Sequence, residues 1–183
     1  MQNKKYELLD NDTVTTWDGR TLKRIRALVA IGSLVAAGEL GGYIESEDNL
    51  SQVSGDAWVY GDAQVYGNAR VSGNARVSGN ARVSGDARVS GNARVSGDAR
   101  VSGDARVEQR RDIFWMSIIG SENGTYTAFK NKDGGVSVNR GCFNGTLEQF
   151  VDAVNERHTG QFHQEYQLVI ELTKVRLGVG EAV

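Results

Sequence analysis

Val71-Ser72-Gly73-Asn74-Ala75-Arg76 is one copy of a hexapeptide that occurs nine times, without insertion, between Val53 and Arg106. A strict period this short indicates a solenoid. An α-helix is excluded, because a step of six residues turns each valine by about 240° from the last and forms no apolar stripe. A glycine in every hexapeptide would also cost a helix about 1 kcal/mol per copy.

Each position of the hexapeptide has its own structural role. At the two-residue period of a strand, Val, Gly and Ala share one face, and Ser, Asn or Asp, and Arg share the other. Pairs such as Gly79-Asn80 and Gly85-Asp86 tolerate positive φ, so the corners belong there. With about three residues of strand between corners, three hexapeptides make one triangular coil of eighteen residues.

Residues eighteen apart then lie above one another, and small side chains fill the interior. The sequence predicts three valine ladders: Val53, Val71, Val89 and Val107; Val59, Val77 and Val95; and Val65, Val83 and Val101. Each buried valine contributes about 1.5–3 kcal/mol. One coil cannot cover its own top and bottom, so both ends of the solenoid need caps.

The flanking segments are candidates for these caps. We expect residues 1–52 to form an N-terminal hairpin, with strands over 4–9 and 21–28, and an irregular capping coil. The regular β-solenoid then occupies residues 53–107.

We expect residues 112–183 to form a small α+β domain of the order βββαα. Its strands are predicted over 113–119, 124–130 and 135–140. Thr146 and Gln149 make a capping box that begins the first helix. A second helix runs from about Gln161 to Leu177 and ends at Gly178. The predicted apolar face of that helix consists of Phe162, Tyr166, Val169, Ile170, Thr173 and Leu177.

The hexapeptide resembles that of left-handed parallel β-helices, the fold of the hexapeptide-repeat acyltransferases. The resemblance implies a mainly β protein with a left-handed parallel β-helix. Two flanking stretches resemble hexapeptide-repeat proteins of bacteriophages and prophages: Gly38-Glu39-Leu40-Gly41-Gly42-Tyr43-Ile44 and Arg140-Gly141-Cys142-Phe143-Asn144-Gly145-Thr146-Leu147. This second resemblance implies a phage-type protein.

The family resemblance also offers a test for catalysis. Acyltransferases of this fold generally use a histidine as general base, often beside a loop that interrupts the coils, and the repeat contains neither. His158 and His163 flank the expected turn between the helices, and they lack a third metal ligand in a recognisable motif. We therefore expect no catalytic site, no metal and no cofactor. A divergent or degenerate acyltransferase is the alternative.

Composition agrees with a small soluble intracellular protein, and the phage resemblance implies the cytoplasm of the bacterial host. The chain of 183 residues has a net charge of −2, and its longest mostly apolar run, Leu28–Ala37, is too short to span a membrane. We therefore expect no membrane association. Cys142 has no second cysteine with which to form a disulfide, and we expect it to be a small buried side chain.

The outward arginines form rows that resemble a binding site for a polyanion. Seven arginines and five aspartates, however, leave the repeat block at only +2. A solvated face of mixed charge is the favoured interpretation, so nucleic acid is not the expected partner.

The first coil has a distinctive surface, because Trp58, Tyr60 and Tyr66 replace the Arg and Ser of later repeats. Stacking places Trp58 over Arg76, which suggests a cation–π contact. Two interpretations are open for this group. The aromatics pack under the hairpin as part of the cap, or they form an interface with a partner or a second copy.

The phage resemblance implies a phage-type binding or assembly protein that interferes with a host component, such as a defence protein, and the uninterrupted repeat without a histidine predicts that it is non-enzymatic. A core only about 15 Å long is marginal alone, so we also expect a homo-oligomer, with a trimer favoured over a dimer.

Overall fold

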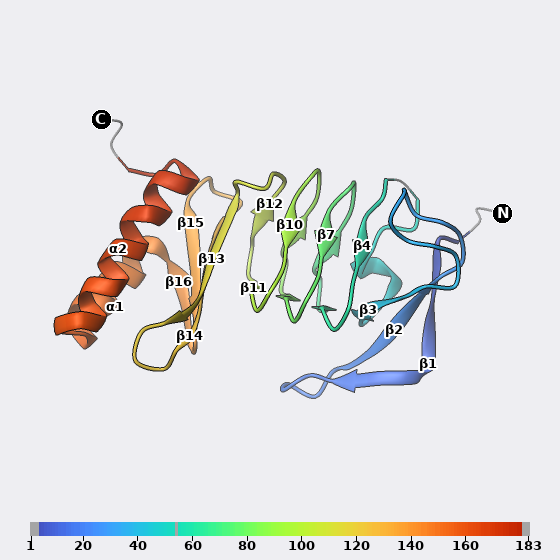
Figure 1. Ribbon diagram of the computed structural model, residues 1–183, viewed down its shortest axis with the longest axis horizontal. Coiled ribbons are helices and arrows are strands. Elements are labelled where there is room, and N and C mark those ends of the chain that lie inside the picture. Colours follow the sequence, from blue (N-terminus) through green and yellow to red (C-terminus); the bar gives the residue numbers. More distant parts are fainter. Residues whose placement is uncertain (1–3, 54, 181–183) are drawn as a thin grey trace.

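The computed structural model describes residues 4–53 and 55–180. Four parts follow one another along the long axis: an N-terminal hairpin, the solenoid, an antiparallel sheet and two helices (Figure 1). The hairpin consists of β1 (Tyr6–Thr15) and β2 (Thr21–Ala27). Both expected strands are present, and the first extends six residues beyond its expected end at Leu9.

The solenoid strands each contain two residues, and they stack as three parallel ladders. The strands are β4 (Trp58–Val59), β5 (Gln64–Val65), β6 (Arg70–Val71), β7 (Arg76–Val77), β8 (Arg82–Val83), β9 (Arg88–Val89), β10 (Arg94–Val95), β11 (Arg100–Val101) and β12 (Arg106–Val107). Their orders are β5-β8-β11, β4-β7-β10 and β6-β9-β12. Partners such as Arg76 and Arg94 are eighteen residues apart, which confirms the predicted coil.

The interior and the corners also follow the hexapeptide. From Ala57 to Val107, the valines and alanines of the repeat are 0–1% exposed. The repeat glycines, from Gly55 to Gly103, have φ between +58° and +73°. The corners therefore lie at the Gly-Asn and Gly-Asp pairs, as predicted.

The first valine ladder does not begin where the sequence predicts. Val53 is 65% exposed, and Leu50 instead forms a parallel bridge with Val71. The strand β3 (Leu40–Ile44) likewise places Ile44 beside Val65. Both pairs are twenty-one residues apart, so the first coil contains three more residues than the others.

The hairpin closes this end by extending one of the three ladders. β2 pairs with β3 in the antiparallel sense, and β3 pairs with β5 in the parallel sense. The short 3₁₀ helix η1 (Glu47–Asn49) ends at the buried Asn49. The amide nitrogen of Asn49 donates to the carbonyls of Gly67 and Ala69 at 3.0 and 2.9 Å. The Asn49 side chain thereby hydrogen-bonds two backbone carbonyls of the next coil.

The C-terminal sheet contains four strands, one more than predicted. They are β13 (Ile113–Ile119), β14 (Gly124–Lys130), β15 (Val136–Arg140) and β16 (Phe143–Thr146), in that order. β16 was missed because its segment is short and contains Asn144 and Gly145, which are typical of turns. A turn with Gly141 at φ +59° folds this segment onto β15.

This sheet caps the solenoid with one face and carries the helices on the other. Phe129 belongs to the solenoid core, whereas its neighbours Tyr126 and Ala128 pack with the helices. The Arg100 backbone, which has no further coil beside it, pairs with cap side chains. Its N–H donates to Thr127 Oγ1 at 3.1 Å, and its carbonyl accepts from Asn139 Nδ2 at 2.8 Å. The cap thus provides hydrogen-bond partners for the backbone N–H and C=O of Arg100 in the last coil.

The helices are α1 (Leu147–Arg157) and α2 (Gly160–Leu177). Thr146 and Gln149 form the predicted capping box, with the Thr146 N–H donating to Gln149 Oε1 at 2.9 Å. The predicted inner face of α2 is buried apart from Phe162, which is 40% exposed. Among the described residues, no helix is long and apolar enough to cross a membrane.

Two stacked corner glycines give a test of the coil spacing. A Cβ at Gly85 would lie 2.8 Å from the nitrogen of Gly103, whereas a Cβ at Gly103 meets no atom within 4 Å. Both have positive φ. We expect Gly103→Ala to cost about 1 kcal/mol from φ alone, and Gly85→Ala about 2–3 kcal/mol, because it also overpacks the corner. Equal losses in chemical denaturation would contradict this geometry.

A carboxylate at the junction between solenoid and sheet, that of Asp112, makes the free energy of unfolding depend on pH. Asp112 accepts from the backbone N–H of Glu108 and Gln109 at 3.1 and 2.8 Å, and Lys130 Nζ lies 2.8 Å away. Burial alone would raise its pKa, but Lys130 and these two amides together hold the Asp112 pKa below the usual value.

Because this pKa is lowered on folding, the stabilising contribution of Asp112 is present above about pH 4, the unfolded value. It is lost as the pH falls through the folded value. We expect Asp112→Asn to lower the free energy of unfolding by about 1–2 kcal/mol at pH 7. The gap to wild type should narrow at pH 3 in urea titrations. A gap that is constant with pH would contradict the assignment.

Candidate functional site

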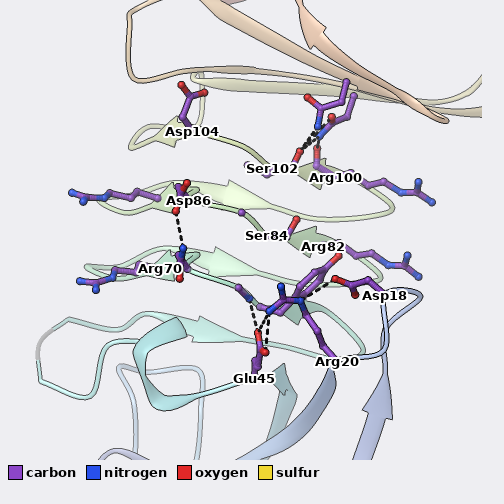
Figure 2. A pocket seen from close by; sticks show the side chains of 18 of the residues that line it. Asp18, Arg20, Glu45, Arg70, Arg82, Ser84, Asp86, Arg100, Ser102 and Asp104 are labelled. Atoms are coloured by element: carbon purple, nitrogen blue, oxygen red, sulfur yellow. Dashed lines mark hydrogen bonds and ion pairs between the residues drawn. The ribbon is translucent and has the colours of Figure 1, made fainter.

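An open groove of about 1500 Å³ runs along one corner of the solenoid, between its two caps. The corner connects the ladder β5-β8-β11 to the ladder β6-β9-β12, and its floor carries Asn68, Asp86 and Asp104. We call this surface the corner groove. Figure 2 shows arginine side chains extending away from the corner on both sides of Asp86.

The tip of the N-terminal hairpin forms one wall. Arg20 fastens this tip, because its guanidinium pairs with Asp18 at 2.9 Å and with Glu45 at 3.1 Å. Glu45 in turn accepts from the backbone N–H of Gly67 at 2.7 Å. Trp17, which lies at the tip and lines the groove, is 86% exposed. The wall thus presents a large aromatic side chain to solvent beside a fixed ion-pair network.

The C-terminal sheet forms the opposite wall. Asn139 and Asn144 donate from their amide nitrogens to Ser102 Oγ at 3.0 and 2.8 Å, which ties the β15–β16 hairpin to the last coil. Lys132 also lines this wall. Cys142 lies here and is exposed, so the expectation of a buried cysteine is wrong. It falls in the turn between β15 and β16, a segment that the sequence did not predict as a hairpin.

The arginines along the groove are available for a ligand. Arg82 and Arg100 lie on one side of the corner, and Arg70 and Arg88 on the other. These four form no ion pair with any residue in the described ranges. Arg106 differs, because it donates to backbone carbonyls of its own corner. The groove therefore presents four unpaired guanidinium groups.

The floor aspartates have other partners than these arginines: Asp86 accepts from a stacked amide, and Asp104 pairs with Lys132 Nζ at 3.6 Å. Asn68 Nδ2 donates to Asp86 Oδ1 at 3.0 Å, and at another corner Asn80 Nδ2 donates to Asp98 Oδ1 at 3.0 Å. An amide stacked on a carboxylate is stabilising where two stacked carboxylates would repel.

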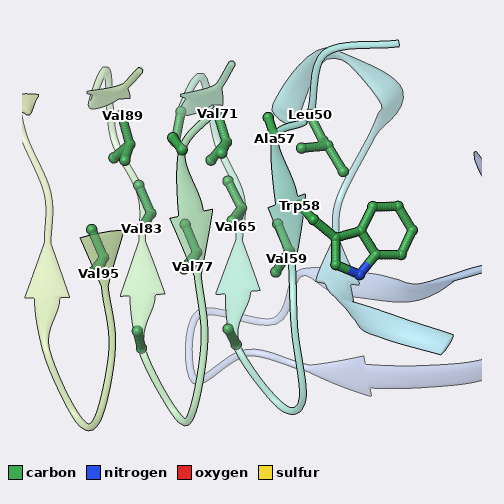
Figure 3. Packing of buried hydrophobic residues seen from close by; sticks show 14 of the residues in the cluster. Leu50, Ala57, Trp58, Val59, Val65, Val71, Val77, Val83, Val89 and Val95 are labelled. Carbon is green, nitrogen blue, oxygen red and sulfur yellow. The ribbon is translucent and has the colours of Figure 1, made fainter. Parts of the chain in front are cut away.

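The aromatics singled out from the sequence lie away from the groove floor or beneath the cap. Trp58 is 0% exposed and meets Tyr6 edge to face, with ring centroids 6.1 Å apart. Figure 3 shows Trp58 at the end of the row of stacked valines. Tyr66 is 8% exposed and packs with Leu22 and Tyr43. Tyr60 is half-buried against the main core. An exposed aromatic interface at Trp58 and Tyr66 is therefore wrong, and the capping interpretation accounts for them.

Arg76 lies beside Trp58 in the ladder, as predicted. Among the described side chains, however, Trp58 and Arg76 make no cation–π contact. The cation–π contact at this end of the molecule is made by Arg24, whose guanidinium carbon is 4.2 Å from the Tyr43 ring centroid. Trp17 was not predicted from the sequence as a site residue. Its signal was its place beside Asp18-Gly19 at a hairpin tip, where a tryptophan has no sheet face to pack on.

The histidines lie at the far end of the molecule from the hairpin. His158 follows α1 as its C-cap, with its ring centroid 4.9 Å from that of Tyr166. His163 Nε2 is 2.9 Å from Asn155 Oδ1. No group of three or more His, Cys, Asp or Glu side chains that could hold a metal ion occurs in the described part of the chain.

Three parallel ladders, glycine corners and a cap at each end define a repeat β-solenoid protein. Residues 51–110 match the YdcK beta solenoid repeat in overlapping segments at 51–67, 63–85, 75–91, 87–101 and 93–110. The match covers the solenoid and confirms the prediction of a repeat β-helix. A search of curated proteins finds no match to the chain.

Proposed function

We propose that this chain is a non-enzymatic binding protein that holds an acidic segment of a protein partner in the corner groove. The observation that carries the proposal is the set of guanidinium groups on Arg70, Arg82, Arg88 and Arg100, which lie between two walls and pair with no carboxylate in the described part of the chain. Arginine pairs with carboxylates in a bidentate geometry. Trp17 supplies an exposed aromatic of the kind that dominates binding energy.

The floor of the groove favours a peptide over a nucleic acid. Asp86 and Asp104 lie between the arginine rows, and their carboxylates would repel a phosphate backbone laid along the floor, whereas a peptide can place its neutral backbone there and its acidic side chains over the arginines. The same carboxylates accept hydrogen bonds from peptide N–H groups. The groove therefore fits an extended peptide that combines backbone donors with acidic side chains.

The proposal extends to the setting in which the protein acts. The resemblance of residues 38–44 and 140–147 to phage proteins supports a phage-type protein of the bacterial cytoplasm. The partner is then a host protein, with a defence component as the specific candidate, and the chain acts as a homo-oligomer.

The test is capture from bacterial lysate with two charge-reversed variants of equal net charge. Arg82→Glu/Arg100→Glu alters the groove, and Arg76→Glu/Arg94→Glu alters the ladder β4-β7-β10, which does not line it. The pairs are matched in exposure, because Arg76 and Arg82 are half-buried and Arg94 and Arg100 are exposed.

We expect one protein to be retained by the wild type and by the control variant, and its recovery to fall at least tenfold on the groove variant. Nuclease treatment should not change that result. Equal recovery on all three proteins, or no retained protein, would overturn the proposal. The acyltransferase alternative instead predicts saturable binding of acetyl-coenzyme A in calorimetry, where our proposal predicts none.

A further inference from the structure

The helix α2 is apolar on two opposite faces, and only one of them packs against the protein. Tyr166, Val169, Ile170, Thr173 and Leu177 are buried against the sheet and α1. On the outer side, Leu168 is 73% exposed, Leu172 39% and Val175 74%. We call these three the outer stripe. Soluble monomers rarely leave a helix apolar on both sides, so the outer stripe indicates a second contact.

The spacing of the outer stripe is that of a coiled-coil seam. Steps of four and three residues separate Leu168, Leu172 and Val175, so they occupy d, a and d positions of a heptad. At about 100° per residue they cover about 60° of the helix circumference. Their centre lies about 140° from the centre of the buried face. A second helix can therefore pack on the stripe without disturbing the fold.

Charged residues border the outer stripe on both sides. Glu171 occupies the g position and Arg176 the e position, each about 40° beyond the edge of the stripe. Both are exposed. In a parallel pair of helices, a g residue faces the e residue five positions further along the other helix. Glu171 of each copy, which pairs with Lys174 of its own helix at 2.8 Å, would then face Arg176 of the other, whose guanidinium carbon lies 5.9 Å from the Phe114 ring centroid. An antiparallel pair would instead bring the two Glu171 side chains together.

We propose that the outer stripe is the self-association surface, and that two copies pair through α2 as parallel helices about a twofold axis. The inference rests on the self-association included in the proposed function, and it replaces a side-by-side trimer with an end-to-end dimer. The expected contacts for the trimer are Trp58, Tyr60 and Tyr66 together with the predicted apolar face of the C-terminal helices. Trp58, Tyr66 and all of the predicted α2 face except Phe162 are buried within the chain. α2 lies at the end opposite the hairpin (Figure 1), so each copy keeps its corner groove open.

The pairing should be weak, because three apolar side chains per copy make a small interface. We expect a dissociation constant of about 1–100 µM. Over that range about 60–95% of the chains are paired near 200 µM, so light scattering should give a weight-average mass about 1.6 to 1.95 times the 19.8 kDa of one chain. A monomer at that concentration would overturn both the dimer and the proposed self-association, while leaving groove binding to be judged by its own experiment.

Substitutions separate the outer stripe from other exposed apolar residues. Leu168→Gln/Val175→Gln should raise the dissociation constant at least tenfold. Leu34→Gln/Val53→Gln, at positions 53% and 65% exposed near the other end, should not change it. The opposite pattern would place self-association at the N-terminal cap and overturn the assignment to α2.

Charge reversal tests the parallel pairing. Glu171→Arg or Arg176→Glu alone should weaken the dimer about tenfold, because each places like charges across the seam. The double variant Glu171→Arg/Arg176→Glu should return to within about threefold of wild type. An antiparallel dimer predicts no such rescue.

Cross-linking gives an independent readout. Cys142, the one cysteine of the chain, is exposed, so the background variant is Cys142→Ser. In it, Val175→Cys should form an intermolecular disulfide on oxidation, because parallel helices place the two d positions opposite each other. Efficient cross-linking only in a mixture of Leu168→Cys and Val175→Cys chains would show antiparallel helices and refute the proposal.

Discussion

Trp58→Ala is expected to lower the free energy of unfolding by about 3–5 kcal/mol. Trp58 is 0% exposed and joins the first solenoid coil to Tyr6 of the hairpin. Alanine would leave a cavity at this junction. Denaturation in urea measures the loss, and the hairpin should detach first, which hydrogen exchange of β1 and β2 would detect.

The matched control is Trp17→Ala, because Trp17 is 86% exposed. Truncating it should change stability by less than about 0.5 kcal/mol while weakening partner binding. The two substitutions therefore separate the capping tryptophan from the groove tryptophan. Equal destabilisation by both would mean that Trp58 does not fill the core as described.

Trp58→Phe refines the same prediction. The indole nitrogen of Trp58 is buried and has no hydrogen-bond partner among the described residues. Phenylalanine removes that unpaired donor and keeps most of the apolar contact with Tyr6. We expect a loss of about 1–2 kcal/mol, well below that of alanine. A loss as large as that of alanine would indicate a hydrogen bond to the indole that the structure does not contain.

The repeat was predictable because every coil buries the same side chains and turns at the same glycine position. Val83 and Ala87 are 0% exposed, and the other repeat valines and alanines from Ala57 to Val107 are 0–1% exposed. Each repeat glycine takes positive φ at its own corner. A strict period thus reports the strand, the corner and the stacking distance together. The capping box at Thr146 was predictable for a similar reason, since its two hydrogen bonds join residues only three positions apart.

Features that depend on distant segments were not predictable. Trp58 stands at an outward position of the hexapeptide, and only the hairpin, with Tyr6, turns that position into a core site. The corner groove likewise needs Trp17 and Lys132, which belong to the two caps. Neither arrangement leaves a periodic signal. The arginine rows were visible in the sequence. That they have no ion-pair partner among the described residues depends on where each corner directs its aspartate, which the sequence does not show.

Leu50→Ala is the second substitution with a large expected effect, and it tests the start of the solenoid. Leu50 is 0% exposed and pairs with Val71 at the top of the ladder (Figure 3). Its carbonyl also accepts from the Tyr6 hydroxyl at 2.6 Å, so the hairpin packs directly on it. We expect a loss of about 2–4 kcal/mol in the free energy of unfolding, from the methyl groups removed and the cavity left.

Val53→Ala is the control, because the hexapeptide frame and the structure disagree at this residue. If Val53 occupied the ladder above Val71, as the uninterrupted repeat predicts, its truncation would remove core contacts. At 65% exposure it should instead cost less than about 0.5 kcal/mol. Urea titrations of both variants decide between the two registers. If Val53→Ala were the destabilising substitution and Leu50→Ala had no effect, the first coil would have the same eighteen-residue spacing as the others. If Leu50→Ala is destabilising and Val53→Ala is not, as we expect, the three additional residues lie in the connection between Leu50 and Val59.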